Sequence, residues 1–385
     1  MTKKKTMADV WKELQAKHGD EGLHIANQDL AEDCEVISTG SIALDDALGV
    51  WGVPRGTVIH LAGAESSGKT MLSLSIIKEW QKQNPDNWAL FVDAEFSFDQ
   101  AWAQSLGVDL DRLMLYKENR ADMIFDRLVG VPGKPNKNTG EIKKVKPGIL
   151  DIEIETGGTG LGVIVLDSIA NIMPHMEQYA SVGKPDMALL ARFLSPALRR
   201  LTPMLSKTGV TFVGINHLKQ DLSVTYGNAE TSPGGKSLKH ASAQMINFAM
   251  INKKELCIMD GNERIGHHVR AKIQKNKKSA PYKVAEFAIE YEKGIANRHV
   301  ELRDLGARYG IIERPNNRTW ILKGETYSSK DAMSEALKDE ELANYVLEES
   351  KKAKKNMINI GSKIKDDEEQ VDDFAVDDEE QIDDE

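Results

Sequence analysis

The segment that most constrains this chain is a glycine-rich octapeptide, Gly-Ala-Glu-Ser-Ser-Gly-Lys-Thr, at residues 63–70. It matches G-x-x-x-x-G-K-[ST] in full, follows an apolar run and precedes a helical pattern, as a phosphate-binding loop requires. Glycines let backbone N–H groups close around phosphate oxygens, and the helix N-terminus adds positive potential. We expect Lys69 on the β- and γ-phosphates of a nucleotide and Thr70 on Mg²⁺. The candidate nucleotide-binding residues are Gly63, Glu65, Ser66, Ser67, Gly68, Lys69 and Thr70.

Short apolar runs alternate with helical patterns around this loop. The runs are residues 57–62, 89–93, 162–167 and 210–215, and the helical patterns are residues 70–83, 98–106, 121–128 and 187–206. This alternation predicts an α/β fold in which helices flank a central, mostly parallel, twisted sheet. Such sheets bind their ligands at the carboxyl ends of the strands.

Two of the runs lead to carboxylates at that edge. Asp167 ends one run and is the expected second Mg²⁺ carboxylate of a phosphate-loop protein. Glu95 follows another run and could orient an attacking water as a general base. The alternative for Glu95 is a helix cap or a structural ion pair.

The segments outside this alternation differ in composition. Residues 7–17 predict a short amphipathic helix that needs a further surface for stability. Residues 131–159 hold five lysines against four acids, and we expect a surface excursion with a short hairpin there. It is either a plain solvated loop or a secondary duplex-binding patch. Residues 269–291 are β-rich, and residues 300–349 predict helices with one turn at 314–318.

The net charge of −10 is divided unevenly along the chain. Residues 366–385 contain thirteen Asp or Glu and no Lys or Arg, whereas the rest of the chain has 50 basic against 47 acidic residues. Such a block predicts disorder. It is either a solubilising tail or a DNA mimic that competes for basic sites. In the second case its removal should strengthen duplex binding.

Composition also excludes several classes of protein. The two cysteines, Cys34 and Cys257, give no disulfide framework or metal-binding spacing and fit a reducing cytosol. No apolar run approaches 18 residues, so we expect no membrane span. Three lysines near the N-terminus precede no apolar stretch, so we expect no signal peptide.

Together these residues resemble the RecA family of strand-exchange recombinases. Val-Asp-Ala-Glu at 92–95, Leu-Asp-Ser at 166–168 and the segments 227–235, 275–277 and 280–282 match its motifs in family order, over residues 36–312. The resemblance implies a RecA-type P-loop ATPase core that binds ATP and Mg²⁺, with Glu95 as catalytic base and with Asp99 and Trp102 against the adenine. We expect an oligomerisation segment at 1–35, the core with its DNA-binding loops at 36–299, a small C-terminal domain at 300–360 and a disordered acidic tail at 361–385.

The family has two mobile loops that face DNA. The first would be residues 177–187, followed by a basic helix, and the second residues 222–239. The resemblance implies Met187 and Leu222 as wedges between base triplets. It also implies phosphate contacts that position DNA without reading its sequence. The candidates for these contacts are Arg192, Ser195, Arg199, Gly234, Gly235, Lys236 and Lys239. The alternative for the second loop is an ordinary surface loop.

Lys275 and Lys277 match family lysines that reach the γ-phosphate of a neighbouring subunit, as arginine fingers do in trans. Otherwise they belong to a solvated basic strand end. His217 stands where bacterial members have the glutamine that senses the γ-phosphate, and His240 replaces a bacterial aromatic. These departures favour the UvsX branch of tailed phages, with His217 in the catalytic set and pH sensitivity possible.

The resemblance implies a DNA-dependent ATPase that polymerises on single-stranded DNA, pairs it with homologous double-stranded DNA and exchanges strands. It implies self-association into a helical filament, a loading mediator and a single-strand-binding protein as partners, and a cytoplasmic location, in the host if phage-encoded. Two alternatives are a hexameric RecA-fold DNA motor or helicase, and an ATP-stabilised DNA-binding filament scaffold. No segment resembles the loader module that a helicase would need, and Glu95 argues against a scaffold.

Overall fold

The computed structural model describes residues 10, 13, 16–17, 34–135, 142–179, 187–220, 230–231, 233–251, 257–316 and 318–369. The chain separates into two compact units, residues 1–35 and 36–385. In the first unit, Val10, Glu13, Ala16 and Lys17 are helical, and the other residues of the helix predicted at 7–17 lie outside the described part. No helix among the described residues is long and apolar enough to cross a membrane.

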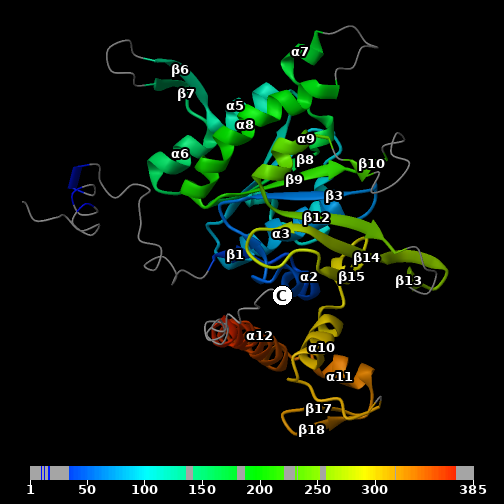
Figure 1. Ribbon diagram of the computed structural model, residues 1–385. Helices are drawn as coiled ribbons and strands as arrows, with labels where there is room; N and C mark the ends of the chain where they lie inside the picture. The colour runs from blue at the N-terminus through cyan, green and yellow to red at the C-terminus, as the bar shows by residue number, and fades with distance from the viewer. Residues whose placement is uncertain are drawn as a thin grey trace, which may run out of the picture. The chain divides into compact units, whose positions relative to one another are not determined.

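A ten-stranded sheet lies at the centre of the described second unit (Figure 1). Its order is β16-β15-β14-β12-β3-β9-β8-β4-β5, with β13 paired to β14. The parallel strands are β12 (Ser242–Met250), β3 (Val58–Gly63), β9 (Thr211–His217), β8 (Leu161–Asp167), β4 (Trp88–Asp93) and β5 (Leu113–Lys117). The antiparallel strands are β13 (Cys257–Asp260), β14 (Glu263–Asn276), β15 (Val284–Glu290) and β16 (Gly294–Ala296). The predicted α/β class with a mostly parallel sheet is therefore confirmed.

Helices cover both faces of this sheet because successive side chains of a buried strand point to opposite faces. In β8, Val163 and Val165 belong to one apolar cluster, whereas Ile164 and Leu166 belong to the other. The first cluster includes α2 (Ile42–Leu48), α3 (Lys69–Gln83) and α4 (Gln100–Ser105). The second includes α5 (Ala121–Val129), α6 (Ile149–Thr156), α8 (Met187–Thr208) and α9 (Gly235–Ala241).

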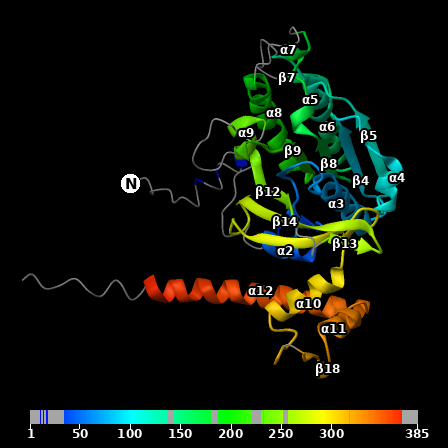
Figure 2. The ribbon, with the colours of Figure 1, turned by 90° about the vertical axis from the view of Figure 1, so that its right-hand side faces the viewer.

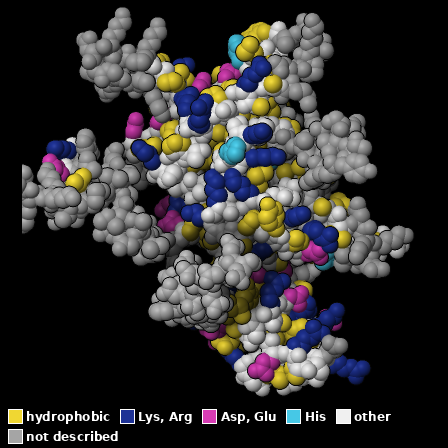
Figure 3. Space-filling view, viewed as in Figure 1, with side chains coloured by type: hydrophobic (Ala, Val, Ile, Leu, Met, Phe, Trp, Pro, Cys, Tyr) yellow, Lys and Arg dark blue, Asp and Glu magenta, His cyan; other side chains and the backbone are white. Residues whose placement is uncertain are grey.

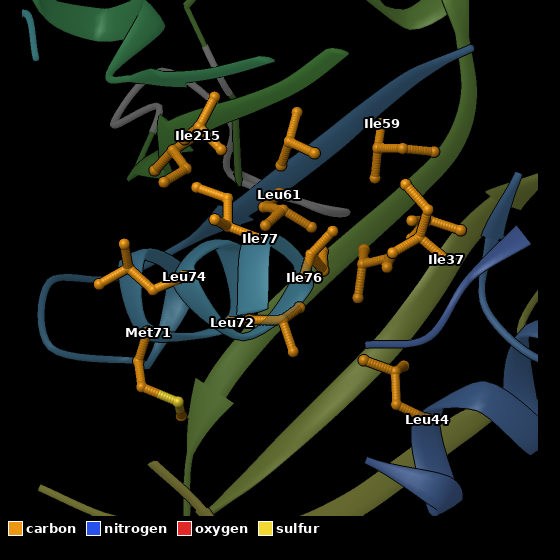
Figure 4. Close-up of a cluster of buried hydrophobic side chains, with 14 of the residues drawn as sticks. Ile37, Leu44, Ile59, Leu61, Met71, Leu72, Leu74, Ile76, Ile77 and Ile215 are labelled. Atoms are coloured by element: carbon orange, nitrogen blue, oxygen red, sulfur yellow. The ribbon is translucent and has the colours of Figure 1, made fainter. Parts of the chain in front are cut away.

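The first cluster fixes the helix that follows the phosphate loop. Figure 4 shows Leu72 and Ile76 of α3 near Ile59 and Leu61 of β3. All four side chains are fully buried. Burying each one contributes roughly 1.5–3 kcal/mol relative to exposing it. The N-terminus of α3 is therefore held firmly at the carboxyl end of β3.

The hairpin expected within residues 131–159 is present as β6 (Val131–Pro135) and β7 (Ile142–Lys146). Its connection at 136–141 lies outside the described residues. Helix α6 follows and was not predicted, nor was β5. Shorter elements are β1 (Val36–Ile37) paired with β2 (Val53–Pro54), β10 (Lys219–Gln220) paired with β11 (Glu230–Thr231), and α7 (His175–Gln178).

The C-terminal region has its own apolar cluster, which includes Leu302, Trp320, Met333 and Val346. Its elements are α10 (Arg298–Arg308), β17 (Trp320–Leu322), β18 (Glu325–Tyr327), α11 (Lys330–Ala336) and α12 (Glu340–Glu369) (Figure 2). The expectation of helices with one turn missed the β17–β18 hairpin. Its turn residues Lys323 and Gly324 both have positive φ, 52° and 82°, as type I′ turns require, but lysine is an unusual first residue there.

The last helix differs from the expected tail. Helix α12 continues to Glu369, so residues 361–369 are helical where we predicted disorder. Surface pairs three residues apart, such as Lys351 with Glu348 and Lys352 with Glu349, support the exposed helix. The acidic residues 370–385 lie outside the described part of the chain.

Candidate active site and nucleic-acid interface

The octapeptide 63–70 connects β3 to α3. Gly68 has φ 93°, and a Cβ there would lie 2.5 Å from Ile289 Cδ1, so a side chain would be strained and crowded. Ser67 is 1% exposed, and its Oγ has no hydrogen-bond partner among the described residues. Lys69 Nζ donates to the carbonyl oxygens of Gly63 at 3.1 Å and Ala64 at 2.6 Å. The Ser67 hydroxyl is thus buried without a partner in the described chain, and the Lys69 ammonium is bonded to backbone carbonyls of its own loop. A phosphate oxygen bound in the loop would accept hydrogen bonds from both groups.

Four adjacent parallel strands bring their carboxyl ends to this loop. Because β3, β9, β8 and β4 are neighbours in the sheet, the side chains that follow them converge. They line a cavity of about 600 Å³ together with the phosphate loop. Its polar lining includes Glu65, Lys69, Thr70, Glu95, Asp167 and His217.

Thr70 and Asp167 form the oxygen pair expected for a metal ion. Thr70 Oγ1 donates to Asp167 Oδ2 at 2.7 Å. Burial raises the pKa of Asp167 to about 6, and the Thr70 hydrogen bond opposes that rise. A hydroxyl and one carboxylate, completed by phosphate oxygens and water, suit the coordination of Mg²⁺. The described residues contain no group of three or more His, Cys, Asp or Glu side chains that could hold a metal.

Glu95 is held by two donors from neighbouring strands. Ser168 Oγ donates to Glu95 Oε1 at 2.6 Å, and His217 Nε2 lies 3.0 Å from the same oxygen. We assign the ring proton of His217 to Nε2, because Nε2 can then donate a hydrogen bond to the Glu95 carboxylate. Burial raises the pKa of Glu95, but the two hydrogen bonds outweigh burial and hold that pKa below its usual value. Glu95 is therefore an oriented carboxylate and caps no described helix, and its contact with His217 is an ion pair whenever His217 is protonated.

Asp93 orients the segment that carries Glu95, a role that the sequence did not indicate. Its Oδ1 accepts from the Ser97 backbone N–H and its Oδ2 from the Phe98 backbone N–H, both at 3.1 Å. Ser168 was likewise identified only as part of the Leu-Asp-Ser motif at 166–168, with no role of its own. The Ser168 contact joins the ends of two different strands, so strand pairing had to be known first, whereas the Asp93 contacts lie within five residues of one strand end.

Asp99 and Trp102 also line the cavity, Asp99 as the N-cap of α4 and Trp102 within that helix. Asp99 caps this helix by accepting from the Trp102 backbone N–H at 3.1 Å. Trp102 Nε1 donates to the Tyr291 carbonyl oxygen at 2.8 Å, which fixes the indole ring. Tyr291 also lines the cavity, and its distance in sequence hid it from motif reasoning. An indole beside a tyrosine gives a flat base an aromatic environment.

The candidate phosphate-contacting residues lie on α8 and α9. Arg192, Ser195 and Arg199 are spaced so that they share one face of α8. Gly234 and Gly235 begin α9 with φ values of 100° and 66°, and Lys236 and Lys239 follow on that helix, exposed. Figure 3 shows Lys and Arg side chains gathered on the face that α8 and α9 occupy. The Met187 side chain and Leu222 lie outside the described residues, as do residues 180–186 of the first predicted loop and residues 222–229 and 232 of the second.

The two glycines pack closely against α8. A Cβ on Gly234 would lie 3.0 Å from Leu194 Cδ1, and one on Gly235 would lie 3.0 Å from Ala191 Cβ. Glycine is therefore required by close helix approach as well as by positive φ. Helices α8 and α9 therefore pack closely together here, and we call this pair of helices the α8–α9 unit.

Lys275 and Lys277 do not line the cavity of their own chain. Lys275 Nζ donates to the carbonyl oxygens of Lys239 at 2.5 Å and His240 at 3.3 Å, and Lys277 Nζ donates to His240 O at 3.2 Å. They thus satisfy carbonyls at the C-terminal end of α9. Partial burial, with the neighbouring Lys277 ammonium, lowers the pKa of Lys275.

This combination of sheet, phosphate loop and strand-end carboxylates has a counterpart among known families. A family model described as the RecA N-terminal domain matches residues 5–130 and 139–296. The gap between these ranges, residues 131–138, covers β6 and the start of its connection to β7. The rest of the excursion at 131–159, with β7 and α6, lies within the match, so we were wrong to expect that the family has no counterpart for the whole excursion.

Named relatives agree with that match. Protein RecA of Mesomycoplasma hyopneumoniae (strain 7448) is 34% identical over 326 residues, covering 84% of this chain and 87% of the relative. Protein RecA of Francisella tularensis subsp. novicida (strain U112) is 34% identical over 315 residues, covering 82% and 79%. The chain belongs to the RecA family of recombinases.

Proposed function

We propose that this protein is an ATP-dependent recombinase. It polymerises on single-stranded DNA, pairs that strand with homologous double-stranded DNA and exchanges strands. The observation that carries the proposal is the cavity in which Lys69, the Thr70–Asp167 pair and Glu95 converge. Membership of the RecA family supports the same function.

The cavity supports hydrolysis of ATP to ADP and phosphate. Trp102 and Asp99 hold the adenine end, and the phosphate loop with Lys69 holds the phosphates. Thr70 and Asp167 would hold Mg²⁺, which supplies charge neutralisation on the phosphates when it is bound. Glu95 accepts a hydrogen bond from the attacking water. As the water oxygen bonds to the γ-phosphorus and the bond to the β–γ bridging oxygen breaks, Glu95 takes the water's proton.

The hydrogen-bond pattern of Glu95 suits that role. Both Ser168 and His217 occupy Oε1, and within the described chain Oε2 accepts no hydrogen bond, so Oε2 is available to a water. The lowered pKa of Glu95 keeps it ionised at neutral pH. It makes Glu95 a weak base whose main contribution is orientation of the water.

We further propose that Lys275 and Lys277 complete the site of a neighbouring subunit. They do not line the cavity of their own chain, and their hydrogen-bond partners are neutral carbonyls. An anionic γ-phosphate is a stronger partner for an ammonium than a carbonyl is. Head-to-tail assembly into a filament would therefore be coupled to hydrolysis.

Mixed assemblies test this arrangement. A Lys69→Ala chain lacks a working phosphate loop, and a Lys275→Ala/Lys277→Ala chain lacks the proposed trans cations. Each alone should show no DNA-dependent hydrolysis, whereas a mixture should recover part of it. If the mixture stays inactive while each chain still binds single-stranded DNA, the lysines act within their own subunit.

The DNA surface is proposed on α8, α9 and the loops that precede them. Arg192, Arg199, Lys236 and Lys239 would contact phosphates, with Ser195 and the N–H groups of Gly234 and Gly235. His217 in place of the bacterial glutamine supports a UvsX-like branch, with a loading mediator and a single-strand-binding protein as partners. Phosphate contacts predict strong weakening of DNA binding as salt is raised.

A strand-invasion assay tests the function as a whole. The protein, ATP, Mg²⁺ and a single strand should yield joint molecules with a homologous duplex and none with a heterologous duplex. Lys69→Ala should abolish both hydrolysis and joint molecules. Equal product from both duplexes, or product from neither, would contradict the recombinase and leave the motor or the scaffold. A slowly hydrolysed ATP analogue separates those two, because a motor stalls with it and a scaffold does not.

A further inference from the structure

A second buried side chain of the nucleotide cavity has polar atoms without partners, as Ser67 does. His267 lies on β14, lines the same cavity and is 3% exposed. Both of its ring nitrogens are buried without a hydrogen-bond partner among the described residues. Of the cavity-lining residues that the structure describes, only Ser67 and His267 have such atoms. Because nearly all buried polar groups in folded proteins are hydrogen-bonded, these atoms indicate where a ligand supplies the partners.

The strand register places His267 next to a neighbour of the phosphate loop. His267 and Ile289 of β15 lie directly opposite each other in the antiparallel pair, so their side chains lie on the same face of the sheet. Ile289 also lines the cavity, and its Cδ1 would lie 2.5 Å from a Cβ on Gly68. The imidazole is therefore separated by one side chain from the glycine at the N-terminus of α3.

His267 also contacts the aromatic end of the cavity. Its ring centroid lies 5.6 Å from that of Tyr291, with the two planes tilted by 48°. The Tyr291 carbonyl oxygen accepts the hydrogen bond from Trp102 Nε1, and we have proposed that Trp102 holds the adenine. The imidazole thus lies between the residues proposed for the base and the loop proposed for the phosphates. In a nucleoside triphosphate, the sugar joins these two parts.

The protonation state of His267 suits sugar hydroxyls better than phosphates. Burial, together with the charges of Arg264 and His268, lowers the pKa of His267 below its ordinary value of 6.5, so the ring is neutral at pH 7. A neutral imidazole has one N–H donor and one nitrogen acceptor. Hydroxyl groups both donate and accept, so they match this pair. A phosphate oxygen only accepts and would leave the second nitrogen without a partner.

A purely structural role does not account for the ring. A phenylalanine at this position would pack against Tyr291 with a similar flat surface. It would avoid the loss of stability that two buried nitrogens without partners cause. The imidazole therefore has a use only when a ligand bonds its nitrogens.

We infer that His267 binds the sugar hydroxyls of the nucleotide and makes this site prefer a ribonucleotide to an analogue that lacks those hydroxyls. The inference rests on the proposed function, because that function places ATP in this cavity. A site whose buried groups bond a hydroxyl rejects an analogue without it, since those groups are then left unpaired. His267 therefore determines which nucleotide is bound.

One variant and one matched control test this role. His267→Phe keeps a flat ring against Tyr291 and removes both nitrogens. His268→Phe makes the same change at the next residue of β14, whose side chain points to the opposite face of the sheet and lines a different cavity. Isothermal titration calorimetry measures the dissociation constants of ATP and of 2′,3′-dideoxy-ATP with Mg²⁺, at a temperature where circular dichroism shows every variant folded.

The wild type should bind ATP about 3- to 15-fold more tightly than 2′,3′-dideoxy-ATP, as expected for hydrogen bonds to neutral groups. His267→Phe should bind the two nucleotides with nearly equal affinity, through weaker binding of ATP, and His268→Phe should keep the wild-type ratio. A wild type that binds no ATP would contradict the proposed function itself.

The inference alone is overturned, and the proposed function stands, if the wild type binds both nucleotides equally or if folded His267→Phe keeps the wild-type preference. An equal loss of preference in His268→Phe would overturn it as well. Inosine triphosphate keeps the sugar and changes the base edge. If His267→Phe alters only the ratio of ATP to inosine triphosphate affinity, the ring binds the base and the sugar assignment is wrong.

Discussion

Thr70 and Asp167, 97 positions apart in the sequence, are joined by a 2.7 Å hydrogen bond at the carboxyl edge of the sheet. The bond connects the first turn of α3 to the end of β8. The strand that leads into α3, β3, is not paired with β8, because β9 lies between them in the sheet. The pair therefore forms only because the phosphate loop brings the first turn of α3 to the carboxyl end of β8.

Loss of the Thr70 hydroxyl should raise the requirement for Mg²⁺. Thr70→Val keeps the shape of the side chain but removes one oxygen ligand, so half-maximal hydrolysis should need at least about tenfold more Mg²⁺. Thr70→Ser keeps the oxygen and serves as the control. Equal Mg²⁺ dependence for Thr70→Val and wild type would show that the hydroxyl does not hold the metal.

Removal of the Ser168 hydroxyl should slow hydrolysis without weakening nucleotide binding. Ser168→Ala leaves Glu95 with one donor, so its pKa rises and its orientation loosens; we expect kcat to fall about tenfold or more at a similar KM. Glu95→Gln should fall further, by about 100- to 10,000-fold. Ser73→Ala is the matched control, because the buried Ser73 donates to Thr70 O rather than to a carboxylate. An equal loss in both serine variants would indicate a general effect on packing.

A buried ion pair attaches the last helix to the core. Lys354 Nζ lies 2.8 Å from Asp46 Oδ1, and Arg308 and Tyr309 also donate to this carboxylate. Burial raises the pKa of Asp46, but these donors outweigh burial and the pKa lies below its usual value. Removing one partner of such a pair leaves an uncompensated charge, which costs about 3–5 kcal/mol.

Asp46→Ala should therefore destabilise the protein by about 3–5 kcal/mol in chemical denaturation. Lys354→Met should cost less, because Asp46 keeps its other two donors. The exposed pair Lys352–Glu349 gives the comparison: Lys352→Ala should change stability by less than about 1 kcal/mol. If Lys354→Met and Lys352→Ala have equal effects, the buried pair contributes no more than a surface pair.

Glu301 should make stability depend on pH. It accepts from Ser41 Oγ at 3.0 Å and the Ala43 N–H at 2.8 Å, and burial raises its pKa to about 7, with the hydrogen bonds opposing. The unfolded carboxyl, with a pKa near 4.5, loses its proton first as pH rises. The folded state thus binds more protons between about pH 4.5 and 7, and its stability falls across that range.

Glu301→Gln should remove this decline. It should be more stable than the wild type at pH 8 by on the order of 1–3 kcal/mol, and the advantage should shrink towards pH 5. Denaturation at the two pH values measures it. Glu335→Gln, at an exposed surface pair, is the control and should show no such trend. A constant difference between Glu301→Gln and wild type at pH 5 and 8 would contradict the buried titration.

Much of the fold was predictable because its signals are local. The runs at residues 57–62, 89–93, 162–167 and 210–215 are mostly apolar, which is how strands buried on both faces appear. The weaker strand β5, partly exposed along its length, and the β17–β18 hairpin gave no such signal. In both cases pairing and packing with distant residues decide the conformation.

The sequence by itself determined the phosphate loop, the α/β class and the family, because each depends on residue types at fixed spacing. Only the tertiary structure placed Ser168 and His217 on the same oxygen of Glu95, Tyr291 beside Trp102, and Asn216 against Pro233. These contacts join residues from different strands and loops. Strand order and register set which of them meet, and no spacing along the chain encodes that geometry.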